Sequence, residues 1–234
     1  MRCETMTMAM TTTKLYQTLS LDMATAIAKQ LKEKPDSNLG LPTGASPLGA
    51  YQLLSQWSKE NQLDWSQCRC FALDEYLEAD LEETFAYYLQ HNLYQNTNLP
   101  AKNKFNPAKN DNYDSLIESF GGLDLTILGI GRNGHIAFNE PGTPQHSFTH
   151  CTFLAESTRK ANQTFFAEGE KVPKKAVTMG IETILNSKRI VLIASGKQKK
   201  EILEKALQGD IDINIPASFL SLHEHVTVLS DFEY

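Results

Sequence analysis

Residues 123–142 read LDLTILGIGRNGHIAFNEPG. The apolar run at 123–130 predicts a β-strand, and the glycines that follow have the G-x-G-x-x-G spacing used to bind a dinucleotide pyrophosphate. A dinucleotide site also needs a helix after the third glycine and an acidic residue at the end of the next strand, about 20 residues on. Pro141 and Gly142 interrupt any such helix, and the acidic residue is missing. The loop is therefore predicted to contribute chemistry of its own.

The polar side chains of this loop are Asn133, His135 and Glu140. A carboxylate beside a histidine orients the imidazole ring and stabilises its charged form, so such a pair can move a proton. His135 could instead make a structural hydrogen bond to the backbone. The residues alone leave both interpretations open.

Strands and helices alternate along the chain. The patterns predict strands at 38–42, 68–73, 123–130, 189–194 and 226–229, and helices at 21–33, 48–57, 84–94, 111–120, 174–185 and 198–207. This alternation favours an α/β fold in which an open, mostly parallel sheet has helices on both faces. Residues 13–234 are expected to form a single domain, preceded by a polar, loosely ordered leader at 1–12.

Composition narrows the class of protein. The 234 residues are 41% hydrophobic and 21% charged, which suits a soluble globular protein, and a net charge of −6 without a basic tract argues against nucleic-acid binding. No apolar run reaches the roughly 20 residues that a membrane helix needs. The first residues lack the apolar core of a secretory signal. The four cysteines include no C-x-x-C pair, which predicts reduced thiols and a cytoplasmic protein.

In an open parallel sheet, ligands bind beyond the carboxyl ends of the strands. Four predicted strand ends carry distinctive residues: TGASP at 43–47, DEY at 74–76, the loop at 129–142 and SGKQKK at 195–200. We expect these four segments to converge on one crevice.

The first of these segments has small residues that lead from a strand into a helix near Pro47. Backbone N–H groups at a helix N-terminus face outward, with the positive end of the helix dipole behind them, and Thr43 and Ser46 add hydroxyls. This combination suits a phosphate group, although the G-x-x-x-x-G-K-[ST] pattern of a Walker loop is absent. The alternative is a plain tight turn with Ser46 as the N-cap.

Charged side chains follow two other predicted strands. Lys197, Lys199 and Lys200 open a helix where their charges oppose its dipole, so either a nearby anion explains them or they form a solvated basic patch. Asp74 and Glu75 follow an apolar strand directly, where paired carboxylates could bind a metal, act as a base or cap a helix.

Three stretches together, GLPTGASPLGAY at 40–51, FALDEYL at 71–77 and GIGRNGHIAFNEPG at 129–142, resemble the glucosamine-6-phosphate deaminase family. The resemblance covers most of the chain, and the string GHIAFNEP is highly specific. It implies the Rossmann-like sheet of that family. A sibling family, 6-phosphogluconolactonase, shares the fold and the phosphate loop, but its corresponding loop lacks the glutamate of the NEP segment.

The resemblance implies the conversion of D-glucosamine 6-phosphate and water to D-fructose 6-phosphate and ammonia. Asp74 would be the base that moves a proton from carbon 2 to carbon 1. His135, helped by Glu140, would open the pyranose ring. Many relatives have aspartate at the position of Asn133, and an asparagine can orient His135 but lends no full charge.

The resemblance also implies a set of substrate-binding residues: Thr43, Gly44, Ala45, Ser46, Gly131 and Lys199. An arginine that some relatives add falls at Thr164 here, so that contact is expected either to be missing or to be supplied by another residue such as Arg159. No metal and no cofactor are expected.

Longer bacterial relatives bind N-acetylglucosamine 6-phosphate at a subunit interface through basic residues after the NEP segment. The equivalent positions here are His150 and Thr152, and the sequence ends at Tyr234. The resemblance therefore implies a monomer or small homo-oligomer without this activation. Two rival functions remain at this point, a 6-phosphogluconolactonase and a non-catalytic sugar-phosphate sensor.

Overall fold

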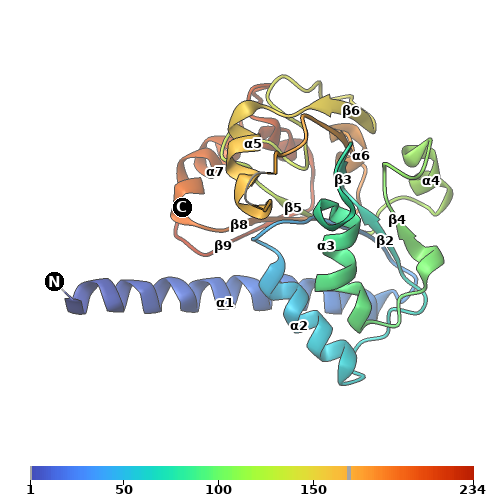
Figure 1. The fold of residues 1–234 in the computed structure, drawn as a ribbon, viewed down its shortest axis with the longest axis horizontal. Helices are drawn as coiled ribbons and strands as arrows, with labels where there is room; N and C mark the ends of the chain where they lie inside the picture. The colour runs from blue at the N-terminus through green and yellow to red at the C-terminus, as the bar shows by residue number, and fades with distance from the viewer. Residues whose placement is uncertain (1, 168–169) are drawn as a thin grey trace.

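The computed structural model describes residues 2–167 and 170–234, with the backbone alone for residues 2–14 (Figure 1). The helices are α1 (Arg2–Glu33), α2 (Leu48–Lys59), α3 (Phe85–Asn92), α4 (Tyr113–Ser119), α5 (Glu156–Asn162), α6 (Ile181–Leu185) and α7 (Lys200–Leu207). The strands are β1 (Asn38–Leu41), β2 (Arg69–Ala72), β3 (Asp74–Tyr76), β4 (Lys104–Phe105), β5 (Leu125–Gly129), β6 (His150–Phe153), β7 (Lys175–Thr178), β8 (Ile190–Ala194) and β9 (Val226–Ser230).

Short 3₁₀ helices complete the chain: η1 (Leu81–Glu83), η2 (Tyr94–Asn96), η3 (Ala101–Asn103), η4 (Gln163–Phe165), η5 (Lys197–Lys199) and η6 (Pro216–Leu222). Helix α1 begins well before the expected helix at 21–33. The expected leader at 1–12 falls on Met1, outside the described residues, and on a stretch whose side chains are not described. Its loose order therefore stays an expectation.

Six strands form one sheet in the order β4-β2-β1-β5-β8-β9, and all the pairs in it are parallel. The expected α/β fold is confirmed, since the five predicted strands correspond to β1, β2, β5, β8 and β9. Because the strands are parallel, their carboxyl ends meet at one edge of the sheet.

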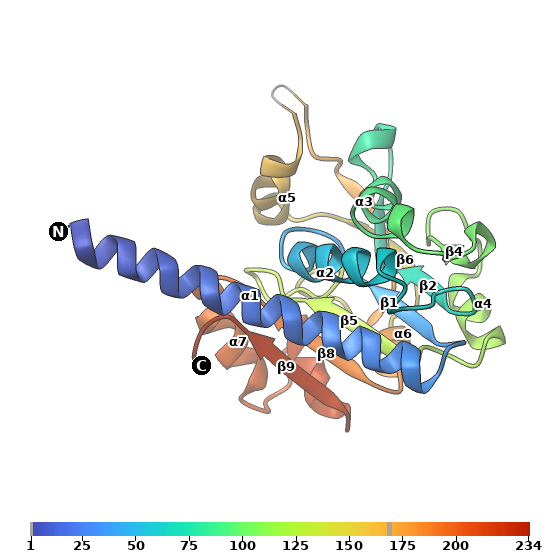
Figure 2. The ribbon, with the colours of Figure 1, turned by 90° about the horizontal axis from the view of Figure 1, so that it is seen from below.

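Alternate side chains of the strands enter two different cores. In β5, Ile127 packs with α1 and α2 on one face of the sheet, whereas the next residue, Leu128, packs with α4, α6 and α7 on the other. Figures 1 and 2 show α1 and α2 together on the first face and α7 on the opposite one. Gly40 lets β1 approach β5 closely, because a Cβ there would lie 2.9 Å from Thr126 Oγ1.

A second, antiparallel sheet has the order β3-β7-β6 and was not predicted. The predicted helix at 174–185 is wrong in its first half, which is strand β7, and only Ile181–Leu185 is helical. Val177 and Thr178 are β-branched and both neighbouring strands pair with them, so tertiary pairing overrides the helical spacing. Strand β6, between the loop at 129–142 and α5, was likewise not predicted.

The predicted strand at 68–73 divides at Leu73, where the chain passes from the first sheet to the second. The Leu73 N–H donates to Leu41 O, and its carbonyl accepts from Met179 N. Asp74 and Glu75 therefore open strand β3 instead of a loop. Asn112 is the N-cap of α4, whereas Asp114 accepts a hydrogen bond from the Thr149 N–H.

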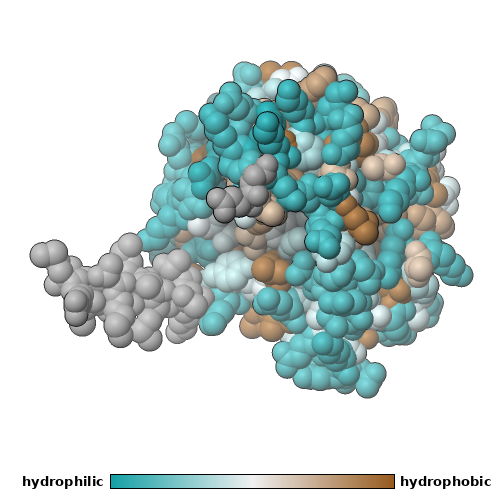
Figure 3. All heavy atoms as spheres, viewed as in Figure 1, coloured by the Kyte–Doolittle hydropathy of each residue, from teal (hydrophilic) through white to brown (hydrophobic). Residues whose placement is uncertain are grey.

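Within the described part of the chain, none of the helices combines the length and the apolarity that crossing a bilayer requires. The face of the molecule in Figure 3 is mostly hydrophilic, with hydrophobic residues in small, separate areas. Cys68 and Cys70 are buried and unpaired, as expected, whereas Cys151 is exposed.

Candidate active site

The four predicted segments all follow carboxyl ends of strands in the parallel sheet. Residues 43–46 follow β1, Asp74 follows β2 by one residue, the loop from Ile130 follows β5, and Ser195 follows β8. Since β2, β1, β5 and β8 are consecutive neighbours in the sheet, the four segments lie along one edge.

The loop at 43–46 offers backbone donors. Pro47 is the N-cap of α2 and no side chain caps this helix, so the alternative in which Ser46 is the N-cap is wrong. The N–H groups of residues 43–46 have no hydrogen-bond acceptor among the described residues. Gly44 has a φ of +94°, the left-handed conformation that glycine adopts most easily.

Three tyrosine hydroxyls, each from a different helix, donate hydrogen bonds to backbone carbonyls at this loop: Tyr51 to Pro42 at 2.6 Å, Tyr88 to Gly44 at 2.6 Å and Tyr16 to Ala45 at 3.1 Å. The loop is thus fixed from α1, α2 and α3. No pattern in the sequence marks these tyrosines, because their role depends on packing between helices.

The segment after β8 is held by a buried carboxylate. Asp231 accepts hydrogen bonds from the Ser195 hydroxyl and the Gly196 N–H, both at 2.7 Å. Lys199 lies close to Arg132 of the β5 loop. Burial and then the positive charge of Arg132 lower the pKa of Lys199, and the negative charge of Asp231 opposes this effect. Two cations near each other, without an ion-pair partner in the described residues, suit an anionic ligand.

Asp74 is a buried carboxylate that lacks donors. Its side chain is only 7% exposed and accepts no hydrogen bond from any described residue. Burial, followed by the charge of the adjacent Glu75, raises the pKa of Asp74 well above its usual value. A carboxylate with a raised pKa is a stronger base than an exposed one.

Glu75, unlike the adjacent Asp74, accepts several hydrogen bonds and has a structural role. Its carboxylate accepts from the N–H groups of Tyr76, Phe85 and Ala86 and from the Asn106 side chain. Two of these donors belong to the first turn of α3, so Glu75 caps that helix from a distance. Of the roles that the sequence left open for the pair, capping applies to Glu75.

His135, Glu140 and Asn133 come together, as predicted. His135 Nδ1 lies 3.7 Å from Glu140 Oε2, and Asn133 Nδ2 donates to the same oxygen at 2.7 Å. Asn133 Oδ1 accepts from the His135 N–H at 3.3 Å, so Asn133 ties the two ends of the loop together. Gly131 lies against the imidazole ring, because a Cβ there would be 2.3 Å from His135 Cε1.

Glu140 remains ionised in this setting. Burial acts to raise its pKa, but the hydrogen bond and charge of His135, with hydrogen bonds from Thr158 and Asn133, lower it to about 2. The Ala155 N–H also donates to Glu140 Oε1 at 3.2 Å. Thr158, which the sequence did not indicate, lies 3.5 Å from His135 Nδ1 through its hydroxyl.

Thr178 joins the aspartate to the histidine loop. It is fully buried and directly opposite Asp74 in the β3–β7 ladder, where paired side chains share one face of the sheet. Its hydroxyl accepts from the Phe138 N–H at 3.0 Å, three residues after His135. Asn139 fixes the same turn to β7 through a 2.8 Å hydrogen bond to Met179 O.

Arg159 is not brought to the phosphate loop by any contact in the described residues. Its Nε donates to Val172 O at 3.3 Å, and Thr164, in the 3₁₀ helix η4 that follows α5, is exposed. Its expected contact with the substrate phosphate stays a prediction.

Two surface pockets of the protein lie away from these residues. One, of about 830 Å³, separates α1 from the amino-terminal parts of β8 and β9, and the other, of about 360 Å³, lies between α2 and α3. Among the side chains that the structure describes, in residues 15–167 and 170–234, no group of three or more His, Cys, Asp or Glu is placed to hold a metal ion.

A buried carboxylate, an imidazole–carboxylate pair and unpaired backbone donors along one edge are suited to proton transfer beside an anion, as in an α/β enzyme that acts on an anionic substrate. The chain belongs to the family of glucosamine-6-phosphate isomerases and 6-phosphogluconolactonases, whose model matches residues 10–229. It is 44% identical to a glucosamine-6-phosphate deaminase of Lachnoclostridium phytofermentans over 228 residues, which are 93% of this chain and 97% of that protein. Glucosamine-6-phosphate deaminase 1 of Bacillus subtilis is 43% identical, with 93% and 94% covered.

Solved structures support the assignment of the chain to this family. A structure described as a monomeric glucosamine-6-phosphate deaminase matches with a TM-score of 0.88 and 43% identity, covering 92% of this chain and 93% of that one. A 6-phosphogluconolactonase from Thermotoga maritima matches with a TM-score of 0.70, covering 92% and 94%. At 22% identity, that second likeness shows the fold alone.

Proposed function

We propose that this chain converts D-glucosamine 6-phosphate and water to D-fructose 6-phosphate and ammonia. The proposal rests mainly on Thr178, which links Asp74 to the loop that contains His135. Asp74 pairs with Thr178, and the Thr178 hydroxyl holds the backbone of the loop that presents His135 and Glu140. A buried base and an imidazole–carboxylate pair thus share one rigid frame.

The phosphate is the strongest handle on a hexose phosphate. The free N–H groups of residues 43–46 after β1, together with Lys199 after β8, hold the dianion at one end of the sugar, with Gly131 of the intervening β5 loop beside them. Anchoring this end orients the reacting carbons, and bound orientation can supply several kcal/mol of the barrier.

His135 opens the pyranose by delivering a proton to the ring oxygen and taking up the proton of the carbon 1 hydroxyl, which leaves the aldehyde, while Glu140 and Asn133 hold the imidazole in place. Asp74 then removes the proton from carbon 2. The electron pair of that carbon–hydrogen bond forms the carbon 1–carbon 2 double bond as His135 returns its proton to the aldehyde oxygen. Asp74 returns its proton to carbon 1, which leaves an imine at carbon 2. Water adds to carbon 2 and ammonia leaves.

A 6-phosphogluconolactonase is the second candidate, because that activity occurs within the same family. Hydrolysis of a lactone needs neither a base under carbon 2 nor a carboxylate on the imidazole. The Asn133–Glu140–His135 contacts therefore favour the deaminase, as does the higher identity to proteins of that name.

The test is ammonia release from D-glucosamine 6-phosphate, with mannosamine 6-phosphate, galactosamine 6-phosphate and unphosphorylated glucosamine as controls. We expect ammonia and fructose 6-phosphate in equal amounts from the first substrate alone. Hydrolysis of 6-phosphogluconolactone without ammonia release would make the chain a lactonase. Binding of the sugar phosphate without turnover would make it a sensor.

We further propose that the protein is cytoplasmic, acts as a monomer and needs neither a metal nor a cofactor. The unpaired thiols of Cys68, Cys70 and Cys151 suit a reducing compartment. His150 and Thr152 lie on β6, where His150 bonds to Phe148 O, so neither adds a fixed positive charge for an effector phosphate. Rate curves should be hyperbolic and unchanged by N-acetylglucosamine 6-phosphate, and sedimentation should give one 26.2 kDa chain.

A further inference from the structure

We infer that Tyr16, Tyr51 and Tyr88 are positioning residues that orient the backbone of residues 43–46 to receive a phosphate monoester. This inference rests on the proposed function for the identity of the ligand. Three hydroxyl-to-carbonyl hydrogen bonds, at Pro42, Gly44 and Ala45, support it.

Because the peptide group is planar, these contacts also fix the direction of the next residue's N–H group. In a trans peptide the carbonyl of one residue and the N–H of the next point in opposite directions. A hydroxyl that holds the Pro42 carbonyl therefore directs the Thr43 N–H away from that tyrosine. By the same geometry, Tyr88 directs the Ala45 N–H and Tyr16 directs the Ser46 N–H.

The orientation matters because the two ends of a peptide group have opposite effects on an anion. A carbonyl oxygen facing a phosphate repels it, whereas an N–H donates to it. With three carbonyls turned toward hydroxyls, three N–H groups are left for a ligand, and none of them has an acceptor in the described residues.

The tyrosines are held firmly enough to impose this geometry. Tyr51 is fully buried, and its ring packs edge-on against that of Tyr88 at a centroid distance of 6.3 Å. Tyr16 also accepts from the Gly49 N–H at 3.2 Å, which joins α1 to the first turn of α2. Donors fixed before the ligand arrives cost no reorganisation on binding.

The experiment uses Tyr88→Phe, which removes one hydroxyl and keeps the ring. Tyr87→Phe is the matched control, because Tyr87 is the residue just before Tyr88 in α3. Its ring stacks on His91, and its hydroxyl has no partner in the described residues. For each protein we would measure KM and kcat for glucosamine 6-phosphate and, by calorimetry, the Kd for inorganic phosphate.

In Tyr88→Phe we expect KM and the phosphate Kd to rise together by about three- to tenfold, with kcat within about twofold. Tyr87→Phe should change none of the three constants. Tyr16→Phe should raise both KM and Kd by a smaller factor, since its hydrogen bond is longer, and it replaces Tyr88→Phe if that variant does not fold.

An unchanged KM and Kd in both hydroxyl-deleted variants would overturn the inference, and so would a fall in kcat at constant KM. Absence of ammonia release by the wild-type enzyme would instead defeat the proposed function. In that case the calorimetric Kd values alone would decide whether the tyrosines prepare an anion site.

Discussion

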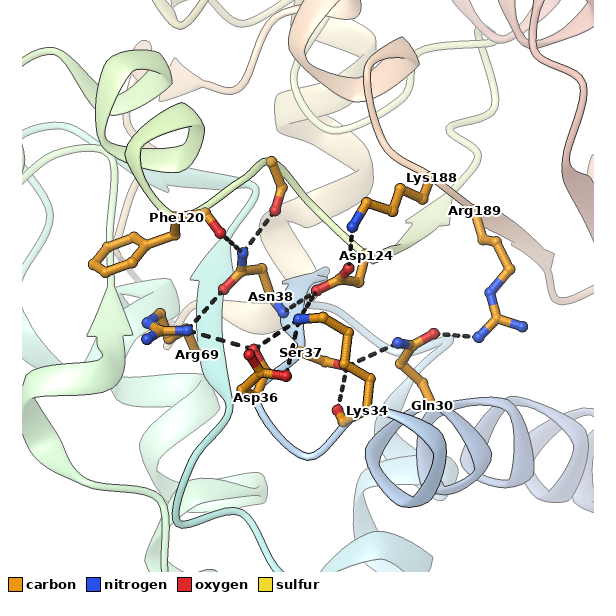
Figure 4. A network of polar contacts seen from close by, with 11 residues as sticks. Gln30, Lys34, Asp36, Ser37, Asn38, Arg69, Phe120, Asp124, Lys188 and Arg189 are labelled. Atoms are coloured by element: carbon orange, nitrogen blue, oxygen red, sulfur yellow. Dashed lines mark hydrogen bonds and ion pairs between the residues drawn. The ribbon is translucent and has the colours of Figure 1, made fainter.

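Two aspartates lie buried at opposite edges of the six-stranded sheet, Asp124 just ahead of β5 and Asp74 just after β2. Asp124 is 3% exposed and Asp74 is 7% exposed, yet their surroundings differ. Figure 4 shows Asp124 inside a network of donors: Lys188 at 2.8 Å, Lys34 at 2.9 Å and the Asn38 N–H at 2.8 Å. Asp74 has no donor among the described residues.

The two pKa values move in opposite directions. At Asp124, burial acts to raise the pKa, but the hydrogen bonds from Lys188, Asn38 and Lys34 lower it. At Asp74, burial and Glu75 both raise it. The same type of side chain therefore has three hydrogen-bond donors and a lowered pKa at one edge, and a raised pKa without donors in the described residues at the other.

The largest expected effect comes from Asp74→Asn. An amide of the same shape cannot accept the carbon 2 proton, so turnover of glucosamine 6-phosphate should fall about 10²–10⁴-fold, the usual contribution of a general base. The matched variant Asp124→Asn should keep turnover within about threefold. Equal losses in the two variants would show that the two edges do not differ in function.

Asp124→Asn should instead lower the free energy of unfolding, because both lysines lose a charged partner. Lys34 and Lys188 are partly exposed, and water screens their loss, so we expect a decrease of about 1–3 kcal/mol. That decrease corresponds to a fall in Tm of roughly 2–4 °C per kcal/mol, measured by calorimetry. An Asp124→Asn protein as stable as the wild type would show that Asp124 has no structural role.

The smallest expected effect is the pH dependence of stability. The contribution of Asp124, whose folded pKa is lowered, is present above the unfolded value near 3.9 and is lost as pH falls through the folded pKa. Asp74 has a raised folded pKa, so wild-type stability should decline as pH rises from about 4 through that value. Asp74→Asn should lack this decline and be more stable at pH 8, by roughly 0.5–2 kcal/mol.

Chemical unfolding of Asp74→Asn and the wild type, at pH 4 and at pH 8, checks the sign for Asp74. A difference between Asp74→Asn and wild type that shrinks as pH rises would contradict the raised pKa of Asp74.

Local patterns predicted the parallel sheet and the meeting of Asn133, His135 and Glu140, because apolar strands and a short glycine-rich loop are encoded by neighbouring residues. The second sheet was missed because Val177 and Thr178 become strand only when β3 and β6 pair with them. Asp231 and the three tyrosines were missed for a related reason. Asp231 accepts from the Ser195 hydroxyl and the Gly196 N–H, and the tyrosines donate to backbone carbonyls, and no spacing rule reveals such partners.

A crystal structure of the Asp74→Asn variant with glucosamine 6-phosphate would test the central claim most directly. The account places the phosphate within hydrogen-bond distance of the N–H groups of Thr43, Ala45 and Ser46, and carbon 2 within about 3–3.5 Å of the residue 74 side chain. A sugar phosphate bound in the pocket between α1 and β9 instead, or with its phosphate turned toward His135, would contradict it.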